Sequence, residues 1–222
     1  MSTVCMSRSE IFAAARPILF NTEMVQAILE GRKTATRRVV NPQPKFFYAG
    51  GKRKDPVNEN GLAFLSMSNG GKDELYVPPY QPGDILYVQE TWKIHALNPA
   101  FCMMVKYRAD DYCNLQVILS PSRFDKFKKF YDKNGWQSPY FMPKEAARIY
   151  LRVTDVRTER LQSITDEEAK QEGCDNSAST ALGFPFVWDS TIKKADLDRY
   201  GWDANPWAWV IQFERIVPTD EN

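Results

Sequence analysis

The stretch GRKTATRRVV, residues 31–40, lies at the junction between a predicted helix and a predicted strand. An apolar stripe at helical spacing precedes it and consists of Met24, Val25, Ile28 and Leu29. Gly31 is well placed to end this helix, because glycine adopts the left-handed backbone of a helix C-terminus without strain. The segment TRRVV, residues 36–40, then predicts a strand. The four cationic side chains of the stretch therefore lie around a turn between two regular elements.

Further elements follow from the hydropathy pattern. Apolar or alternating runs predict strands at residues 16–21, 85–90, 101–110, 148–161 and 207–214. Pro82 and Gly83 fit the two central positions of a type II turn before the second of these strands. The basic and aromatic segment 122–136 predicts either an amphipathic helix or an insertion. The arginines of residues 148–161 favour a solvated sheet face.

The segment ITDEEAKQEG, residues 164–173, predicts a short acidic helix. Thr165 and Glu168 have the spacing of a capping box, and Gly173 can close the helix. Glu172 falls in the last turn, where the helix dipole disfavours a negative charge and should raise the pKa of the carboxyl. This position is a weak indication of function, and an exposed glutamate tolerated at a small cost is the favoured interpretation.

Composition and charge exclude several classes of protein. Lys and Arg total 29 and Asp and Glu total 28, so the chain is not a polycation that coats nucleic acid, and any such contact must come from local patches. His95 is the single histidine and the four cysteines form no C-x-x-C pair, so we expect no metal site and no cofactor. Scattered cysteines without a signal peptide, and an apolar run at 11–20 too short to span a bilayer, predict a cytoplasmic protein without a membrane partner.

The elements together predict an α+β fold, mainly β. Several short strands with few helices describe a small β-barrel with flanking helices and large inserted loops. The 222 residues suit one elaborated domain.

Lys33 and Thr36 are the candidate reactive pair. A tight turn after Gly31 would bring these positions, three apart, onto one side. A lysine whose pKa is depressed by burial and by cationic neighbours can take the proton of a threonine hydroxyl. Glu172 and Glu90 are the carboxylates that could assist. The spacing alone favours a plain surface turn, then a nucleic-acid contact, then a catalytic pair.

Four segments in order resemble the ASCH domain superfamily, which is related in fold to PUA RNA-binding domains. They are ILEGRKTATRR (28–38), QPGDILYVQETW (81–92), ITDEEAKQEG (164–173) and NPWAWVIQFERI (205–216). The chain looks most like the longer members encoded by bacteriophages and prophages. The resemblance implies a PUA-like barrel over residues 1–222, with insertions at about 41–80, 109–145 and 174–200 that it does not explain.

The resemblance also implies site residues. Short bacterial members include amidohydrolases that remove the acetyl group from N4-acetylcytidine, and their motif would make Lys33 the assisting group, Thr36 the nucleophile and Glu172 the carboxylate. Arg37 and Arg38 would hold the oxyanion or a phosphate. Glu90 and Trp92 belong to an ETW segment that the small enzymes lack, so they point to a different ligand, with Trp92 stacking on a base.

Several functions stay open at this stage. The first is binding of RNA or a nucleoside, with amide hydrolysis of an acylated cytidine. The second is a binding module for RNA or single-stranded nucleic acid without catalysis. A ribonuclease, or a phage protein that acts on a host protein through the insertions, are the further alternatives, and the sequence leaves the oligomeric state open.

Overall fold

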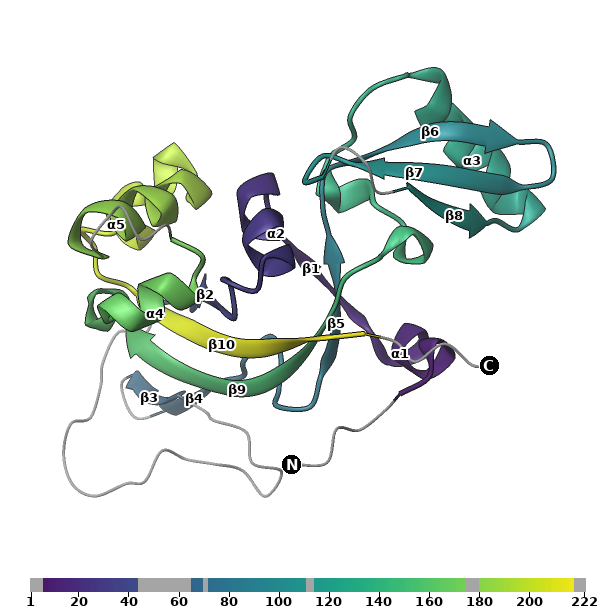
Figure 1. Cartoon of the computed structure of the whole chain (residues 1–222). Helices are drawn as coiled ribbons and strands as arrows, with labels where there is room; N and C mark the ends of the chain where they lie inside the picture. The colour runs from purple at the N-terminus through teal and green to yellow at the C-terminus, as the bar shows by residue number, and fades with distance from the viewer. Residues whose placement is uncertain (1–5, 44–64, 70–71, 111–113, 175–179, 218–222) are drawn as a thin grey trace. The chain divides into compact units, whose positions relative to one another are not determined.

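A computed structural model describes residues 6–43, 65–69, 72–110, 114–174 and 180–217 (Figure 1). The chain forms two compact units whose segments alternate along the sequence. The first unit comprises Met1–Gly31, Asp84–Arg152 and Arg215–Asn222, and the second comprises Arg32–Gly83 and Val153–Glu214. The single domain predicted for residues 1–222 therefore contains two units.

The N-terminal part of the first unit begins with helix α1 (Arg8–Ala14), strand β1 (Arg16–Leu19) and helix α2 (Thr22–Leu29). Asn21 caps α2 by accepting a hydrogen bond from Met24 N. Gly31, as predicted, follows the helix with φ of 75°. Helix α1 was not predicted, although Ser7 and Glu10 form a capping box at its start.

The strands of this part of the first unit form a mixed sheet. Strand β5 (Ile85–Gln89) pairs with β1 in parallel and with the start of β9 (Tyr150–Arg160) in antiparallel orientation. β5 lies between these two strands, and all five of its residues are buried. The prediction of a strand at 85–90 is thus confirmed.

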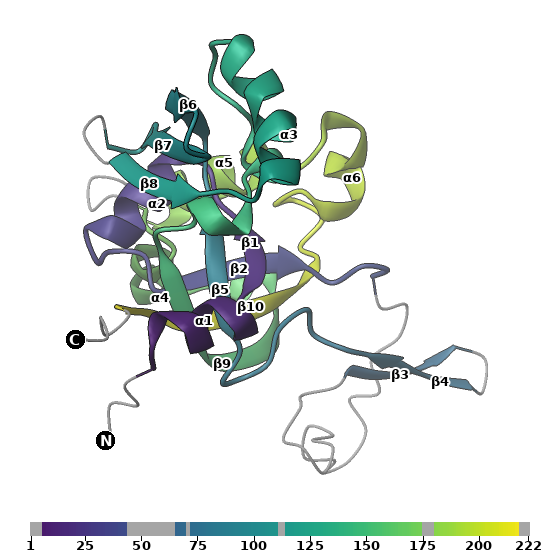
Figure 2. The ribbon, with the colours of Figure 1, turned by 90° about the vertical axis from the view of Figure 1, so that its right-hand side faces the viewer.

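A second sheet of the first unit holds strands β6 (Trp92–Asn98), β7 (Cys102–Tyr107) and β8 (Asn114–Ile118), all antiparallel. Helix α3 (Pro121–Asp132) lies along one side of this sheet (Figure 2). Short 3-10 helices at Pro139–Phe141 and Lys144–Ala146 complete the unit. The segment 109–145 is therefore not a set of loops, because β8 and α3 contribute buried side chains to the core.

The second unit is built on strands β9, β10 (Trp207–Ile216) and β2 (Ala35–Val39), in that order. β10 and β2 are antiparallel, with Ile211 opposite Thr36 and Trp209 opposite Arg38. The unit also has a hairpin of β3 (Leu65–Asn69) and β4 (Lys72–Tyr76). Most of the predicted insertion at 41–80 lies outside the described residues.

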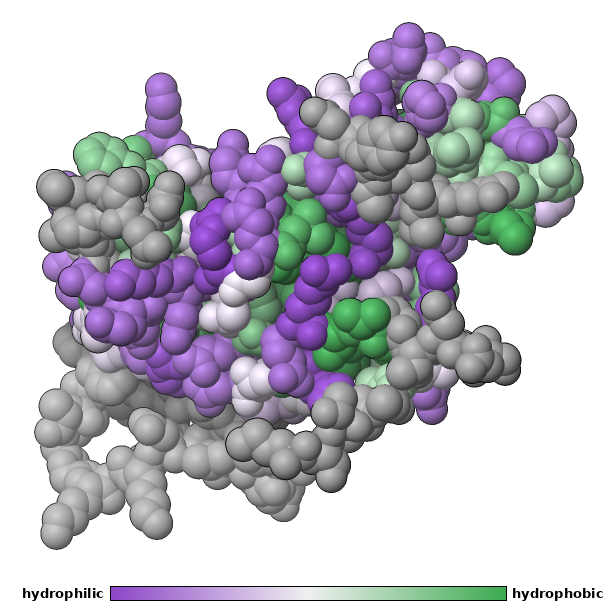
Figure 3. Space-filling view, in the orientation of Figure 1, coloured by the Kyte–Doolittle hydropathy of each residue, from purple (hydrophilic) through white to green (hydrophobic). Residues whose placement is uncertain are grey.

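Helices α4 (Asp166–Gln171), α5 (Thr180–Thr191) and α6 (Leu197–Tyr200), with 3-10 turns at Leu161–Ser163 and Lys194–Asp196, complete the second unit. A small apolar core holds α4 and α5 together and comprises Leu161, Ala169, Phe184, Trp188 and Ala208. Hydrophilic side chains gather over α4, whereas hydrophobic ones reach the surface over α5 (Figure 3). The insertion predicted at 174–200 is thus partly helical and packs on this core.

The fold class is a mixture of helices and sheets, as predicted, but with about as much helix as strand and not mainly β. In the described parts of the chain, the strands form open sheets and no closed barrel. Within these parts, no helix is long and apolar enough to cross a membrane.

Candidate functional site

The backbone just before β2 is joined to the end of α4. Lys33 and Glu172 form an isolated antiparallel β-bridge, and Thr34 N donates to Gln171 O at 2.8 Å. On the other side, Phe213 N donates to Thr34 O at 2.8 Å. The chain at residues 33–34 is therefore held between a helix end and strand β10.

The end of α4 has the hydrogen bonds of a Schellman motif. Gly173 has φ of 90° and donates to Lys170 O, and Cys174 N donates to Ala169 O. Glu172 is the residue at the helix C-cap. The last carbonyl groups still need donors, and these come from Thr34 N for Gln171, from Lys33 Nζ for Glu172 and from Arg32 Nη1 for Gly173.

The ammonium group of Lys33 has three oxygen acceptors. Nζ donates to Ala35 O, to Glu172 O and to Glu172 Oε2, each at 2.8 Å. Lys33 is 2% exposed and Glu172 is 6% exposed. Burial lowers the pKa of Lys33 because it disfavours the charged form, and the nearby Glu172 carboxylate opposes this shift. The predicted lysine and carboxylate thus meet in a buried ion pair.

Arg37 forms ion pairs with carboxylates of the second unit. Its Nη1 lies 3.3 Å from Glu172 Oε1, and its Nη2 lies 2.8 Å from Glu168 Oε2 and 3.4 Å from Glu159 Oε2. Arg157 binds the other oxygens of Glu159 and Glu168. Because its Nη groups bind three carboxylates, the placement of Arg37 does not support the predicted grip on an external anion.

Thr36 and Arg38 are the neighbours of Arg37 in β2. Thr36 is 3% exposed, and its hydroxyl makes no hydrogen bond with the residues that the structure describes. Lys33 Nζ donates to Ala35 and Glu172 and not to Thr36, so the predicted pair is close in sequence without being hydrogen-bonded. Burial lowers the pKa of Arg38, whereas Tyr80 and Glu172 oppose this shift, and the guanidinium stays a cation.

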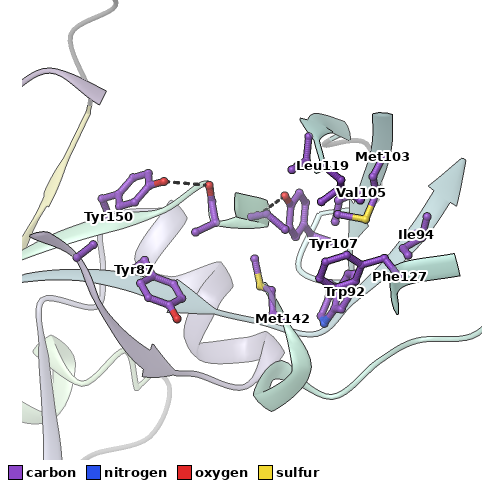
Figure 4. Packing of buried hydrophobic residues seen from close by; sticks show 14 of the residues in the cluster. Tyr87, Trp92, Ile94, Met103, Val105, Tyr107, Leu119, Phe127, Met142 and Tyr150 are labelled. Atoms are coloured by element: carbon purple, nitrogen blue, oxygen red, sulfur yellow. Dashed lines mark hydrogen bonds between the residues drawn. The ribbon is translucent and has the colours of Figure 1, made fainter. Parts of the chain in front are cut away.

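Glu90 and Trp92 belong to the first unit. Glu90 is 1% exposed and accepts from Arg148 Nε at 2.8 Å and from Arg148 Nη2 at 2.9 Å. Burial raises the pKa of Glu90, although Arg148 opposes the shift. Trp92 is fully buried beside Phe127 in the core of the first unit (Figure 4). The structure therefore does not present either residue to a ligand as predicted.

Three further residues contribute to these arrangements and were not predicted as site residues. Glu168 was predicted only as a helix cap, yet its carboxylate also joins Arg37 and Arg157. Arg148 and Arg157 were predicted to line a solvated sheet face, but their side chains are 9% and 30% exposed and form ion pairs. Only the recurrence of arginine over residues 148–160 could have suggested this, because the acidic partners of these arginines come from several elements.

Within the described residues, no group of three or more His, Cys, Asp or Glu side chains could hold a metal ion. The chain matches no family model, and neither a curated protein nor a solved structure matches it. Any assignment of function therefore rests on the geometry of the site and on the resemblance of the four segments.

Proposed function

We propose that the chain is an ASCH-type protein of PUA-like fold and that its second unit hydrolyses the amide of acylated, cytidine-type nucleosides. The observation that carries the proposal is the buried ion pair of Lys33 and Glu172. In the sequence, Lys33 lies three residues before Thr36, which supplies the hydroxyl. A buried lysine beside a single carboxylate is an arrangement suited to proton transfer. The PUA-like barrel itself is part of this proposal.

The chemistry assigns a role to each side chain. Lys33 first gives one proton to Glu172, which makes its amine neutral. Thr36 Oγ1 then attacks the acyl carbon while its proton passes to this amine, and the resulting ammonium protonates the departing cytosine nitrogen. The acyl group is then held as an ester on Thr36. Glu172 returns its proton to Lys33, and water then cleaves the ester. Glu172 accepts a proton of the water while the Lys33 ammonium protonates the departing Thr36 oxygen, so that the threonine hydroxyl is restored. The attack by Thr36 requires Lys33 Nζ to shift one of its present hydrogen bonds to Thr36.

The test is hydrolysis of N4-acetylcytidine and related acylated nucleosides, followed by chromatography of the products. We expect Thr36→Val to abolish turnover because valine has the shape of threonine without the hydroxyl. Thr34→Val is the matched control, since Thr34 is exposed and only its backbone is hydrogen-bonded here. Absence of turnover by the wild-type chain across the panel, or equal activity of Thr36→Val, would reject the proposal.

A binding module without catalysis is the second candidate. It is supported by the three hydrogen bonds that Lys33 Nζ donates, which satisfy the ammonium group. Two of them also satisfy carbonyl oxygens, that of Glu172 at a helix end and that of Ala35 at the start of a strand. Lys33 then has a structural role, and Arg38 contributes to contacts with RNA. This candidate predicts RNA binding that weakens as salt rises, together with no turnover and no effect of Thr36→Val on affinity.

A further inference from the structure

The sheet of β6, β7 and β8 has one covered side. Side chains alternate along β7, so that Met103, Val105 and Tyr107 are buried in the core with Phe127 of α3. The intervening residues of β7 point to the opposite side and are exposed or half-buried. We call this opposite side, with Lys93, Lys106, Arg108 and Trp136, the basic face.

Trp136 lies among cations on the basic face. Lys93 Nζ is 5.1 Å from the centroid of its ring, and Arg108 Cζ is 5.9 Å from it. Lys106 is directly opposite Lys93 in the β6–β7 register. The indole is 37% exposed, so part of its surface is open to a partner. An accessible aromatic ring and three cations are thus gathered at one end of the sheet.

The positive charge of the basic face is not neutralised by the described residues of the chain. Lys93, Lys106 and Arg108 form no ion pair with any of them. The carboxylate of Asp110, which follows Arg108 closely, lies 2.6 Å from Arg148 instead. Two lysines directly opposite each other on one sheet face destabilise it. An external anion would relieve this repulsion.

We propose that the basic face binds single-stranded nucleic acid, with a base stacked on Trp136 and phosphates bound by Lys93, Lys106 and Arg108. Proteins bind single strands by combining cations, which contact the phosphate backbone, with exposed aromatic rings, on which the bases stack. A duplex is a poorer fit because its bases are already stacked on each other. This site lies in the first unit and uses none of the residues of the proposed acyl-hydrolase site.

The lysines are tested by fluorescence anisotropy of the full chain with labelled oligouridine and oligothymidine. The Lys93→Gln/Lys106→Gln double variant should bind more weakly, and each lost phosphate contact should reduce the slope of log affinity against log salt by about 0.7. The matched control is Lys126→Gln/Lys129→Gln, which removes the same charge from exposed positions on α3. Equal weakening by both pairs, or none by the first, would overturn the proposal.

The stacking residue is tested in the same assay. Trp136→Ala should weaken binding roughly 5- to 150-fold, the range found for loss of one stacked base, and Trp136→Phe should restore part of it. Phe186→Ala removes an exposed ring from α5 and should bind as the wild type does. Circular dichroism melting identifies a variant that fails to fold, and Trp136→Phe then decides the result.

Two further outcomes would also overturn the proposal. One is tighter binding of the matched duplex than of the single strands. The other is binding to phosphatidylserine vesicles, abolished in Lys93→Gln/Lys106→Gln, without binding to either oligonucleotide. Because the oligonucleotides carry no acyl group, this experiment succeeds or fails independently of the hydrolysis assay.

Discussion

Lys33 is bound twice by Glu172, since its Nζ donates to both the side-chain Oε2 and the main-chain O at 2.8 Å. The first of these bonds makes an ion pair, and the second satisfies a carbonyl group at the end of α4. One side chain therefore contributes both to the electrostatics of the candidate site and to the attachment of a helix. Stability and activity measurements separate these two contributions.

Lys33→Met should lower the free energy of unfolding of the chain by about 3–5 kcal/mol, the cost of removing one partner from a buried ion pair. The variant leaves Glu172 with Arg37 at 3.3 Å and deprives two carbonyl groups of their donor. Urea denaturation gives the value. Lys170→Met, in an exposed position of α4, is the control and should change it by no more than about 0.5 kcal/mol. Equal values for the two variants would mean that the pair does not stabilise the unit.

Alkaline pH should stabilise the wild type relative to Lys33→Met. Burial lowers the pKa of Lys33 below the ordinary value of 10.5, so the folded chain loses this proton at a lower pH than the unfolded chain. The unfolded state then binds more protons, and the free energy of unfolding rises with pH between the lowered pKa and 10.5. Denaturation of both proteins across this interval measures the difference. A difference that is constant or falls with pH contradicts the shift.

Arg37→Lys should destabilise the second unit by about 2 kcal/mol, because hydrogen bonds to charged groups contribute roughly 1.5–3 kcal/mol each. A lysine is a single point charge and cannot bridge Glu159, Glu168 and Glu172 as the planar guanidinium does. Thermal unfolding checks this result. The same substitution at the exposed Arg199 should have little effect, and a comparable loss there would show that the network around Arg37 is not the cause.

Arg148→Met should cost about 3–5 kcal/mol in the free energy of unfolding, because it leaves the Glu90 carboxylate buried without its bidentate partner. Adding Glu90→Leu should recover much of this loss, since the unpaired buried charge is then removed as well. A double-mutant cycle by urea denaturation gives the coupling energy. If the two losses simply add, Glu90 and Arg148 are not coupled and the geometry of the pair is unimportant for stability.

Local signals in the sequence were sufficient to place many helix ends and strands. Asn21 and Gly31 bound α2, and Thr165, Glu168 and Gly173 bound α4, because capping depends on residues within a few positions of each other. The helix α1 carries the same kind of local signal in Ser7 and Glu10 and could have been predicted. The strand of Trp92–Asn98 was missed because its bulge between Ile94 and Ala96 interrupts the alternation.

Local patterns in the sequence place Lys33, Thr36 and Glu172 near helix and strand ends and identify them as candidates. Tertiary structure decided which of them meet: Lys33 contacts Glu172 across 139 residues, whereas Thr36 makes no hydrogen bond with the described residues. It also assigned Arg37 to internal carboxylates and Trp92 to the core. Burial and ion pairing depend on segments far apart in the chain, and the spacing of residues within one segment does not specify those contacts.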